Sequence, residues 1–413
     1  MKKCLLSLVI AFMIAGNAAA QTEAAILSLL IQPSAQANAM GRASVALAAT
    51  SPAMSAFNPA HFGVLQNQPL FSVEIYPAKT QWLPAFGNGI TFDAKSFAVS
   101  LPLGGQENPQ KFRVGFSYNR THLDLGEQTF TGEDSPEPLG TVSSFERANV
   151  FSVAIGVESF VNLAAGYSFK SIESTLGAIS QSSEVRTINV KPSAHDFGVV
   201  ATLPVLQRFA SDFSFSHGVL KPFLHTTAGY SQSNIGGTVQ YLSSVQADPL
   251  PRVARLGVGV RAGLLKNDWQ VFAFDWSREA EDVLVRRKDS GEIESAPFVG
   301  DIDIVDELFL GKEDRDSIQK TGWAYHIFEV VSIQRGRYYD LQGRVEHGTE
   351  GIGVSLRGFF KLLGNLSPGL ELSEPFDFLL RKLDIHYQTT SWQFDRGHPL
   401  SGTTFKSIRV SLF

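Results

Sequence analysis

The stretch Val253-Ala254-Arg255-Leu256-Gly257-Val258-Gly259-Val260-Arg261-Ala262-Gly263 decides the fold class, because two chemistries alternate along it. Every second position from Ala254 to Ala262 is apolar, and the positions between them hold only arginine and glycine. Successive side chains of a β-strand point to opposite faces, so this period of two predicts a strand with one apolar face. Glycine and arginine on the other face suit the crowded, wet interior of a barrel whose apolar face meets lipid.

The same alternation recurs from about residue 70 to the end of the chain, and turn signals divide it into fourteen candidate strands. They are predicted at 70–76, 89–101, 111–124, 145–157, 161–175, 194–203, 222–235, 252–264, 268–285, 321–330, 332–340, 351–360, 383–393 and 404–413. The sequence therefore predicts an all-β fold, a transmembrane antiparallel β-barrel of fourteen strands.

The connections alternate in length, as they do in outer-membrane barrels with tight periplasmic turns and long external loops. The tight connections are 158–162, 265–268 and 330–332, and the long polar ones are 126–144, 236–251 and 286–320. Two connections, 203–221 and 361–382, break this rule, because both are long and fall on the periplasmic side.

The composition of the chain argues against a helical membrane protein and against a nucleic-acid-binding protein. The 413 residues are 44% hydrophobic and 18% charged, with a mean hydropathy of +0.01. Helices that cross a membrane need apolar runs of about 20 residues, and the sequence has none. The formal net charge of −5 offers no basic surface for nucleic acid. A barrel averages an apolar and a polar face, which also explains 36 Gly beside 31 Phe.

The N-terminus has the plan of a cleavable signal peptide over residues 1–20. A basic start, Met1-Lys2-Lys3, precedes an apolar core at 4–15, and Ala18-Ala19-Ala20 offers a cleavage site. Cys4 lies far from that site, which argues against a lipoprotein anchor. We expect an exported protein of the Gram-negative outer membrane whose mature chain carries no cysteine.

Residues 21–68 differ from the predicted barrel at 69–413, because they are rich in Ala, Ser and Asn and barely alternate. Small side chains permit close approach, so this segment is interpreted as an N-terminal plug inside the barrel. A periplasmic tail is the alternative.

Two motifs in this segment carry a family resemblance. Met40-Gly41 ends the pattern P-x-A-x-A-x-x-M-G, and Asn58-Pro59-Ala60 follows about seventeen residues after the glycine. Both resemble the N-terminus of PorV/PorQ proteins, which belong to the FadL-like outer-membrane barrels. A block from Gly322-Trp323 to Gly353-Val354 also resembles that family, although Ala324 stands where an acidic residue is usual. The resemblance places Met40, Gly41, Asn58, Pro59 and Ala60 in a plug or gate.

The basic residues of the glycine phase are predicted to face the lumen. Charges there can be solvated or paired, whereas each would cost roughly 2–4 kcal/mol at mid-depth on the lipid face. Acids such as Asp275 and Asp384 are the expected partners. Four tryptophans near predicted strand ends are expected to anchor at the membrane interface: Trp82, Trp269, Trp276 and Trp392. The lumenal basic residues are Arg113, Lys170, Arg255, Arg261 and Arg357.

A search of the sequence for catalytic and metal-binding motifs finds no convincing candidate. The sequence contains no nucleophile elbow, zinc helix or phosphate-binding loop. Ser216-His217 has no acid partner nearby, and the acidic run from Asp301 to Asp316 lacks the glycine and glutamate of a calcium loop. We therefore expect no enzyme, no catalytic residue, no metal and no cofactor.

The resemblance implies a non-enzymatic accessory of type IX protein secretion, which would bind the secretion translocon or secreted cargo. The alternative is a FadL-like uptake channel for a hydrophobic small molecule, with the predicted plug as its gate. A barrel hydrolase is a remote third possibility. Outer-membrane lipid is the partner that all three share.

Overall fold

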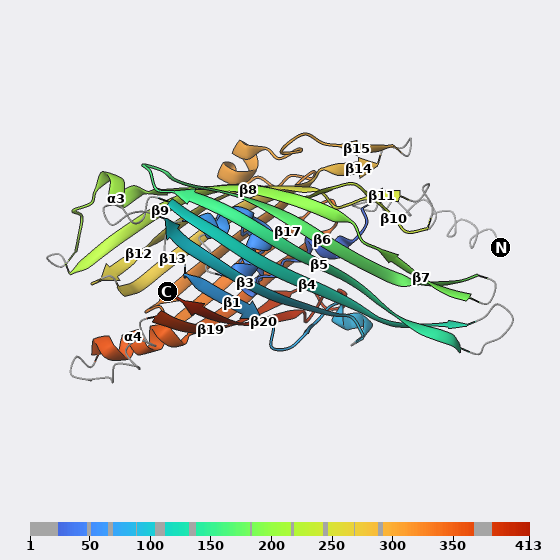
Figure 1. Ribbon diagram of the computed structural model, residues 1–413. Coiled ribbons are helices and arrows are strands. Elements are labelled where there is room, and N and C mark those ends of the chain that lie inside the picture. Colours follow the sequence, from blue (N-terminus) through green and yellow to red (C-terminus); the bar gives the residue numbers. More distant parts are fainter. Residues whose placement is uncertain are drawn as a thin grey trace, which may run out of the picture.

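The computed structural model describes residues 24–47, 51–64, 69–87, 89–103, 112–131, 138–181, 184–215, 219–242, 247–267, 269–287, 292–366 and 382–413. The predicted signal peptide lies outside them. Fourteen antiparallel strands form a barrel (Figure 1). These are β1 (Phe71–Ile75), β3 (Thr91–Leu103), β4 (Phe112–Thr131), β5 (Pro138–Val157), β6 (Asn162–Gln181), β8 (Ser193–Pro204), β9 (Leu220–Gly236), β12 (Val253–Lys266), β13 (Trp269–Val283), β16 (Ile318–Ile327), β17 (Val331–Asp340), β18 (Val345–Ser355), β19 (Leu383–Gln393) and β20 (Thr404–Leu412).

The barrel closes through its first strand, which pairs on both sides. Phe71 lies opposite Leu412 of β20 and opposite Val99 of β3. Two short strands extend the wall, since β2 (Thr80–Gln81) continues β1 along β3 and β7 (Glu184–Val190) continues β8 along β6. The predicted fourteen-stranded barrel is confirmed, and each predicted strand overlaps one of these elements. Closure satisfies the backbone groups that an open sheet edge would expose to lipid.

The two ends of the barrel differ. At one end, here called the turn end, β5 and β6, β12 and β13, and β16 and β17 are joined by tight connections. At the other end, the loop end, β4, β5 and β6 extend far beyond most of the other wall strands, toward the right of Figure 1. Each of these three strands is 20 residues long, about 65 Å at 3.3 Å per residue. Much of the predicted loop 126–144 is therefore strand.

Side chains alternate across the wall as the period of two predicts. Outward positions near the turn end form an apolar belt, in which Ile155 is 65% exposed and Phe116, Phe151 and Leu163 are also exposed. Inward positions are small or polar and largely buried. Among the described residues, no helix has the length and apolarity needed to span a membrane.

One part of the outer wall is covered by protein, which differs from the prediction. The connection between β13 and β16 carries β14 (Val285–Arg287), β15 (Ile293–Ser295) and the π-helix η6 (Ile304–Leu310). It folds back over β9, β12 and β13, so that Leu284 packs on Tyr230 and Ala254, while Leu308 packs on Ala280. Ala254, expected to meet lipid, lies under this connection, whose described residues 284–287 and 292–317 are here called the outer flap.

Two helices occupy the turn end, where the sequence predicted unusually long connections. Helix α3 (Val205–Phe209) joins β8 to β9, and helix α4 (Leu356–Leu366) follows β18 (Figure 1). The strand predicted at 351–360 is wrong beyond Ser355, because apolar residues then recur at 356, 359, 360, 363 and 366. That spacing places them on one face of a helix.

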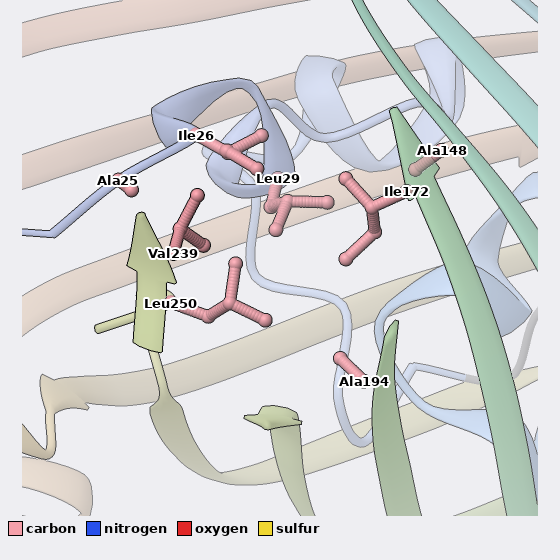
Figure 2. Close-up of a cluster of buried hydrophobic side chains, with 8 residues drawn as sticks. All are labelled: Ala25, Ile26, Leu29, Ala148, Ile172, Ala194, Val239 and Leu250. Atoms are coloured by element: carbon pink, nitrogen blue, oxygen red, sulfur yellow. The ribbon is translucent and has the colours of Figure 1, made fainter. Parts of the chain in front are cut away.

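The N-terminal residues 24–47 and 51–64, here called the inner segment, lie inside the barrel (Figure 1). They form four short helices, η1 (Leu27–Leu30), α2 (Ala35–Ala39), η2 (Pro52–Ala56) and η3 (Pro59–Gly63). Near the loop end, Ala25, Ile26 and Leu29 pack against Ile172 of β6 and Leu250 (Figure 2). The segment then crosses the lumen to the turn end, where β1 begins.

A girdle of lumenal glycines lies against the inner segment, six of them against its backbone and three against its side chains. A Cβ atom added to Gly156 would lie 1.7 Å from the Gly63 carbonyl oxygen, and one added to Gly336 would lie 2.0 Å from the Gly41 nitrogen. The absent side chains are thus replaced by the inner segment itself. The girdle comprises Gly115, Gly156, Gly166, Gly198, Gly229, Gly257, Gly322, Gly336 and Gly351.

We predict that Gly156→Ala displaces the inner segment, because its methyl group cannot coexist with the Gly63 carbonyl. Overpacking of this kind costs about 1–3 kcal/mol. The free energy of unfolding in detergent and proteolysis of the N-terminal residues measure the effect. Gly140→Ala on the same strand, where a Cβ meets nothing within 4 Å, is the control. Equal behaviour of the two variants would contradict this packing.

Candidate functional site

The candidate site is the surface on which the inner segment docks against the barrel wall. At its centre lies a buried ion network on three neighbouring strands, β12, β13 and β16. Arg255 Nε lies 2.5 Å from Glu281 Oε2, and Lys320 Nζ lies 2.6 Å from the same oxygen and 2.8 Å from Glu279 Oε1. All four side chains are at most 2% exposed. Two cations and two anions balance, which buried charges require.

This network holds the inner segment directly. The second carboxylate oxygen of Glu279 accepts the backbone N–H groups of Ser44 at 2.7 Å and Val45 at 2.8 Å. On the next strand, the Arg255 guanidinium lies 4.1 Å from the ring centroid of Phe57, an inner-segment residue. Charge-assisted hydrogen bonds in a buried site are stronger than neutral ones, so the wall fixes this turn of the segment.

Met40 and Gly41 lie inside the barrel, against β16, β17 and β18. Gly41 has φ +65°, a conformation that costs glycine little. An added Cβ would lie 2.6 Å from the carbonyl oxygens of Thr321 and Arg337, so only glycine fits. The Gly41 N–H donates to Thr349 Oγ1 at 2.9 Å, and Met40 is fully buried against Gly322.

Asn58, Pro59 and Ala60 form a cap that turns the inner segment along the wall. The Asn58 side-chain oxygen accepts the Ala60 N–H at 3.1 Å, and Pro59 occupies the first position of η3. The Asn58 amide donates to the Val45 carbonyl at 2.9 Å. This bond joins the two halves of the inner segment.

Hydroxyl groups of the wall satisfy carbonyls of the inner segment that its short helices leave open. Thr390 donates to Ala35 O, Thr349 to Ala39 O and Thr227 to Ala46 O, at 2.7–2.9 Å. Buried carbonyls without a partner would cost free energy, so these hydroxyls substitute for water.

The structure brings most of the predicted lumenal cations to the inner face. Arg261 Nη1 lies 3.1 Å from Asp275 Oδ2, the predicted partner, and Lys170 Nζ lies 2.9 Å from Asp196. Arg113 donates to Ser100 Oγ at 3.0 Å, whose hydroxyl donates to the Phe62 carbonyl.

Arg357 is the exception among these cations. It lies on α4 rather than on a lumenal strand, because β18 ends at Ser355, and its guanidinium lies 4.1 Å from the centre of the Phe413 ring. Asp384, expected to pair with a lumenal cation, instead accepts the Ser355 hydroxyl at 2.7 Å.

The tryptophan prediction is wrong for Trp392, which is buried inside the loop end. Its ring lies 5.1 Å from Phe405 and 5.6 Å from Trp82, measured between centroids. Trp269 is buried as well and stacks on Phe328, while Trp276 is half-buried. The loop-end cluster also contains Ile31 and Ala35 of the inner segment.

A small cavity lies beside the inner segment. Leu47 and Val64 line it together with His225, Arg261 and Asp275 of the wall. Its volume is about 20 Å³, which is room for about one water molecule. His326 Nε2 lies 2.8 Å from Asp275 Oδ2, so the carboxylate is shared by two partners.

The acidic run belongs to the outer flap. Lys312 pairs with Asp306 at 2.8 Å, and Arg286 with Asp301 at 2.6 Å. Burial raises the pKa of the Glu307 carboxyl, which accepts the Asp303 N–H at 2.8 Å. Within the described ranges, no three His, Cys, Asp or Glu side chains are placed to share a metal ion. Ser216-His217 lies outside those ranges.

Comparisons with known proteins add only remote likenesses. No protein-family model and no curated protein matches the chain. Among solved structures, the Ralstonia pickettii toluene transporter TbuX is 11% identical, with 91% of this chain and 96% of that chain covered and a TM-score of 0.41. The Pseudomonas putida toluene transporter TodX is 9% identical, with 91% of this chain and 96% of that chain covered and a TM-score of 0.35. A Pseudomonas aeruginosa FadL homologue is 8% identical, with 91% of this chain and 94% of that chain covered and a TM-score of 0.39. The assignment of the fold therefore rests on the strand order and pairing of the structure itself.

Sequence reasoning missed Glu279, which holds the inner segment, and Glu281 and Lys320, which complete its ion network. A signal was available, because Glu279 and Glu281 flank Ala280 in the same inward phase as Asp275. Carboxylates in that phase imply a buried cation or a set of N–H donors.

We predict that Glu279→Ala lowers the free energy of unfolding by roughly 3–5 kcal/mol, because two buried N–H groups lose their acceptor and Glu281 alone is left to balance Lys320 and Arg255. Glu279→Gln, which keeps one acceptor, should lose less. Urea unfolding in detergent measures both. The control is Glu346→Ala, which breaks an exposed pair with Arg337 worth about 1 kcal/mol or less. A loss at Glu279 no larger than at Glu346 would refute the anchoring role.

Proposed function

We propose that this chain is an outer-membrane barrel protein that acts by binding a protein partner at its loop end, with the inner segment as a plug. The sequence resemblance to PorV/PorQ proteins makes a component of type IX secretion, the translocon or its cargo, the proposed partner. The observation that carries the proposal is the exposed apolar ridge of the outer flap.

The apolar belt supports the membrane location. Outward residues near the turn end are large and apolar, and the next outward positions toward the loop end are Lys95, Arg120 and Asn149, which lie in register with one another. Phe97, Tyr118 and Phe151 form a row of rings just below them. A belt edged by aromatic residues matches the cross-section of a bilayer. The tight turns support a periplasmic position for the turn end.

The filled lumen favours binding over passage. The inner segment crosses the lumen from the loop end to the turn end, is almost wholly buried, and its backbone touches the glycines of the wall. Displacing it would break the Glu279 bonds to Ser44 and Val45. A large free-energy cost opposes opening in this state.

The outer flap presents the surface that a partner could bind. Its helix η6 exposes Ile304, Val305, Phe309 and Leu310, and Phe309 is 68% exposed. Exposed Asp303 lies beside this ridge. An apolar centre with a charged rim is typical of a protein interface, whereas carboxylates would be costly within lipid.

We predict that Phe309→Asp lowers co-purification of the secretion translocon at least tenfold in a host that has type IX secretion. An introduced carboxylate desolvates poorly at the centre of an apolar interface. Leu341→Asp, which changes an exposed leucine on the turn between β17 and β18, is the control and should leave recovery unchanged. Equal recovery with the two variants, or no translocon with the unmodified chain, would sink the proposal.

Gated uptake of a hydrophobic small molecule is the second candidate. The aromatic cluster at the loop end supports it, because Trp392, Phe405 and Phe92 face the lumen and pack against Ile31. Such a surface would bind an apolar solute if the inner segment moved.

Deletion of residues 21–68 separates the two functions. If the segment is a plug, its loss should give planar bilayers containing the barrel an ionic conductance that the intact chain lacks. Uptake of an apolar solute by cells should change only if the chain is a gated channel. Unchanged uptake together with lost secretion would decide against the channel.

A further inference from the structure

Two structured elements at the turn end carry apolar surfaces that the barrel itself does not cover. One is α4, and the other is the α3 arm (205–215), which lies in the connection between β8 and β9. Both lie in the connections that the sequence analysis found too long for a periplasmic turn. Their function is separate from partner binding at the loop end.

Helix α4 turns its polar side to the barrel and its apolar side away. Lys361 Nζ lies 2.7 Å from Glu329 Oε2, and an added Cβ on Gly358 would lie 2.0 Å from the Glu329 carbonyl. On the opposite side, Phe359 and Leu363 are exposed and Leu366 is 71% exposed. A helix of this build lies in the plane of a membrane interface.

The α3 arm has the same character in a shorter form. Phe209 is 67% exposed and meets the ring of Phe160, in the neighbouring turn, at a centroid distance of 5.5 Å. Phe213 and Phe215 are exposed as well, and their rings lie 5.1 Å apart. Arg208 Nε donates to the Phe160 carbonyl at 3.2 Å, which holds the arm against the barrel rim.

We propose that α4 and the α3 arm are anchors in the periplasmic leaflet of the outer membrane, with phospholipid as their ligand. Their apolar faces continue the belt, since Leu356 follows the outward Ile352 and Val354 of β18. Phe160 in the same way follows Ile155 of β5. The inference rests on the proposed membrane location.

The arrangement around the rim favours lipid over a protein partner. Between the two anchors the wall has six strands in one direction, β9 to β18, and eight in the other, β19 to β8. They are thus nearly opposite each other. One docked protein would meet one side of the rim, whereas a bilayer surrounds the barrel and reaches both.

Single-cysteine labelling tests this, because the only cysteine of the chain is Cys4. In a Cys4→Ser background, a fluorophore is attached to Leu366→Cys or Phe209→Cys. The polar-side controls are Asn365→Cys and Gln207→Cys, and Ile155→Cys reports the belt. The folded full chain is placed in phospholipid vesicles that contain nitroxide-labelled lipid and no other protein.

We expect the nitroxide to quench the probes at positions 366 and 209 at least threefold more strongly than those at 365 and 207. If position 155 is quenched while 366 and 209 match their polar controls, the anchors do not bind lipid and the inference is overturned. If position 155 is not quenched either, the membrane location itself fails. The readout does not depend on secretion or uptake, so failure of partner binding leaves it intact.

Discussion

The contact between the inner segment's backbone and the glycines of the wall is the constraint on which the rest of the structure depends. Side chains that fill small barrels from within are absent at these positions. The inner segment takes their place and passes along the wall, with Gly41 at β17, Val45 at β9 and β12, and Gly63 at β5. Without the inner segment the lumen of the barrel would be empty at these glycines, and without the wall the inner segment would have no surface to pack against. Barrel and segment therefore share one core.

The buried charges follow from this shared core. An inner segment made of short helices leaves many N–H and carbonyl groups open. In the lumen water cannot reach them, so the wall supplies Glu279 for two N–H groups and three threonine hydroxyls for carbonyls. Glu279 in turn needs Lys320, because a carboxylate at 0% exposure must be balanced. Polar groups that look like a transport lining are thus explained as docking contacts.

How much of this the sequence predicts depends on the range of each signal. Strand positions were predictable because alternation is local and each strand repeats it. The full height of β4 and β5 was not, since residues 126–144 are mostly polar and resemble a loop. Helix α4 was mistaken for strand because Ile352, Val354 and Leu356 keep the period of two up to its first turn. The motif residues Gly41 and Asn58 were found by resemblance, but the Glu279 network needed register across three strands.

The outer flap shows why an apolar outward phase does not by itself identify a lipid contact. Ala254 belongs to the clearest alternating stretch of the chain, yet it packs under Leu284. The flap covers this apolar part of the wall, but its own helix η6 exposes another apolar surface. Burial of Ala254 gains little that lipid would not supply, so stability alone does not explain the flap. A partner that binds the ridge would explain it, because the same residues then bury area that neither lipid nor barrel covers.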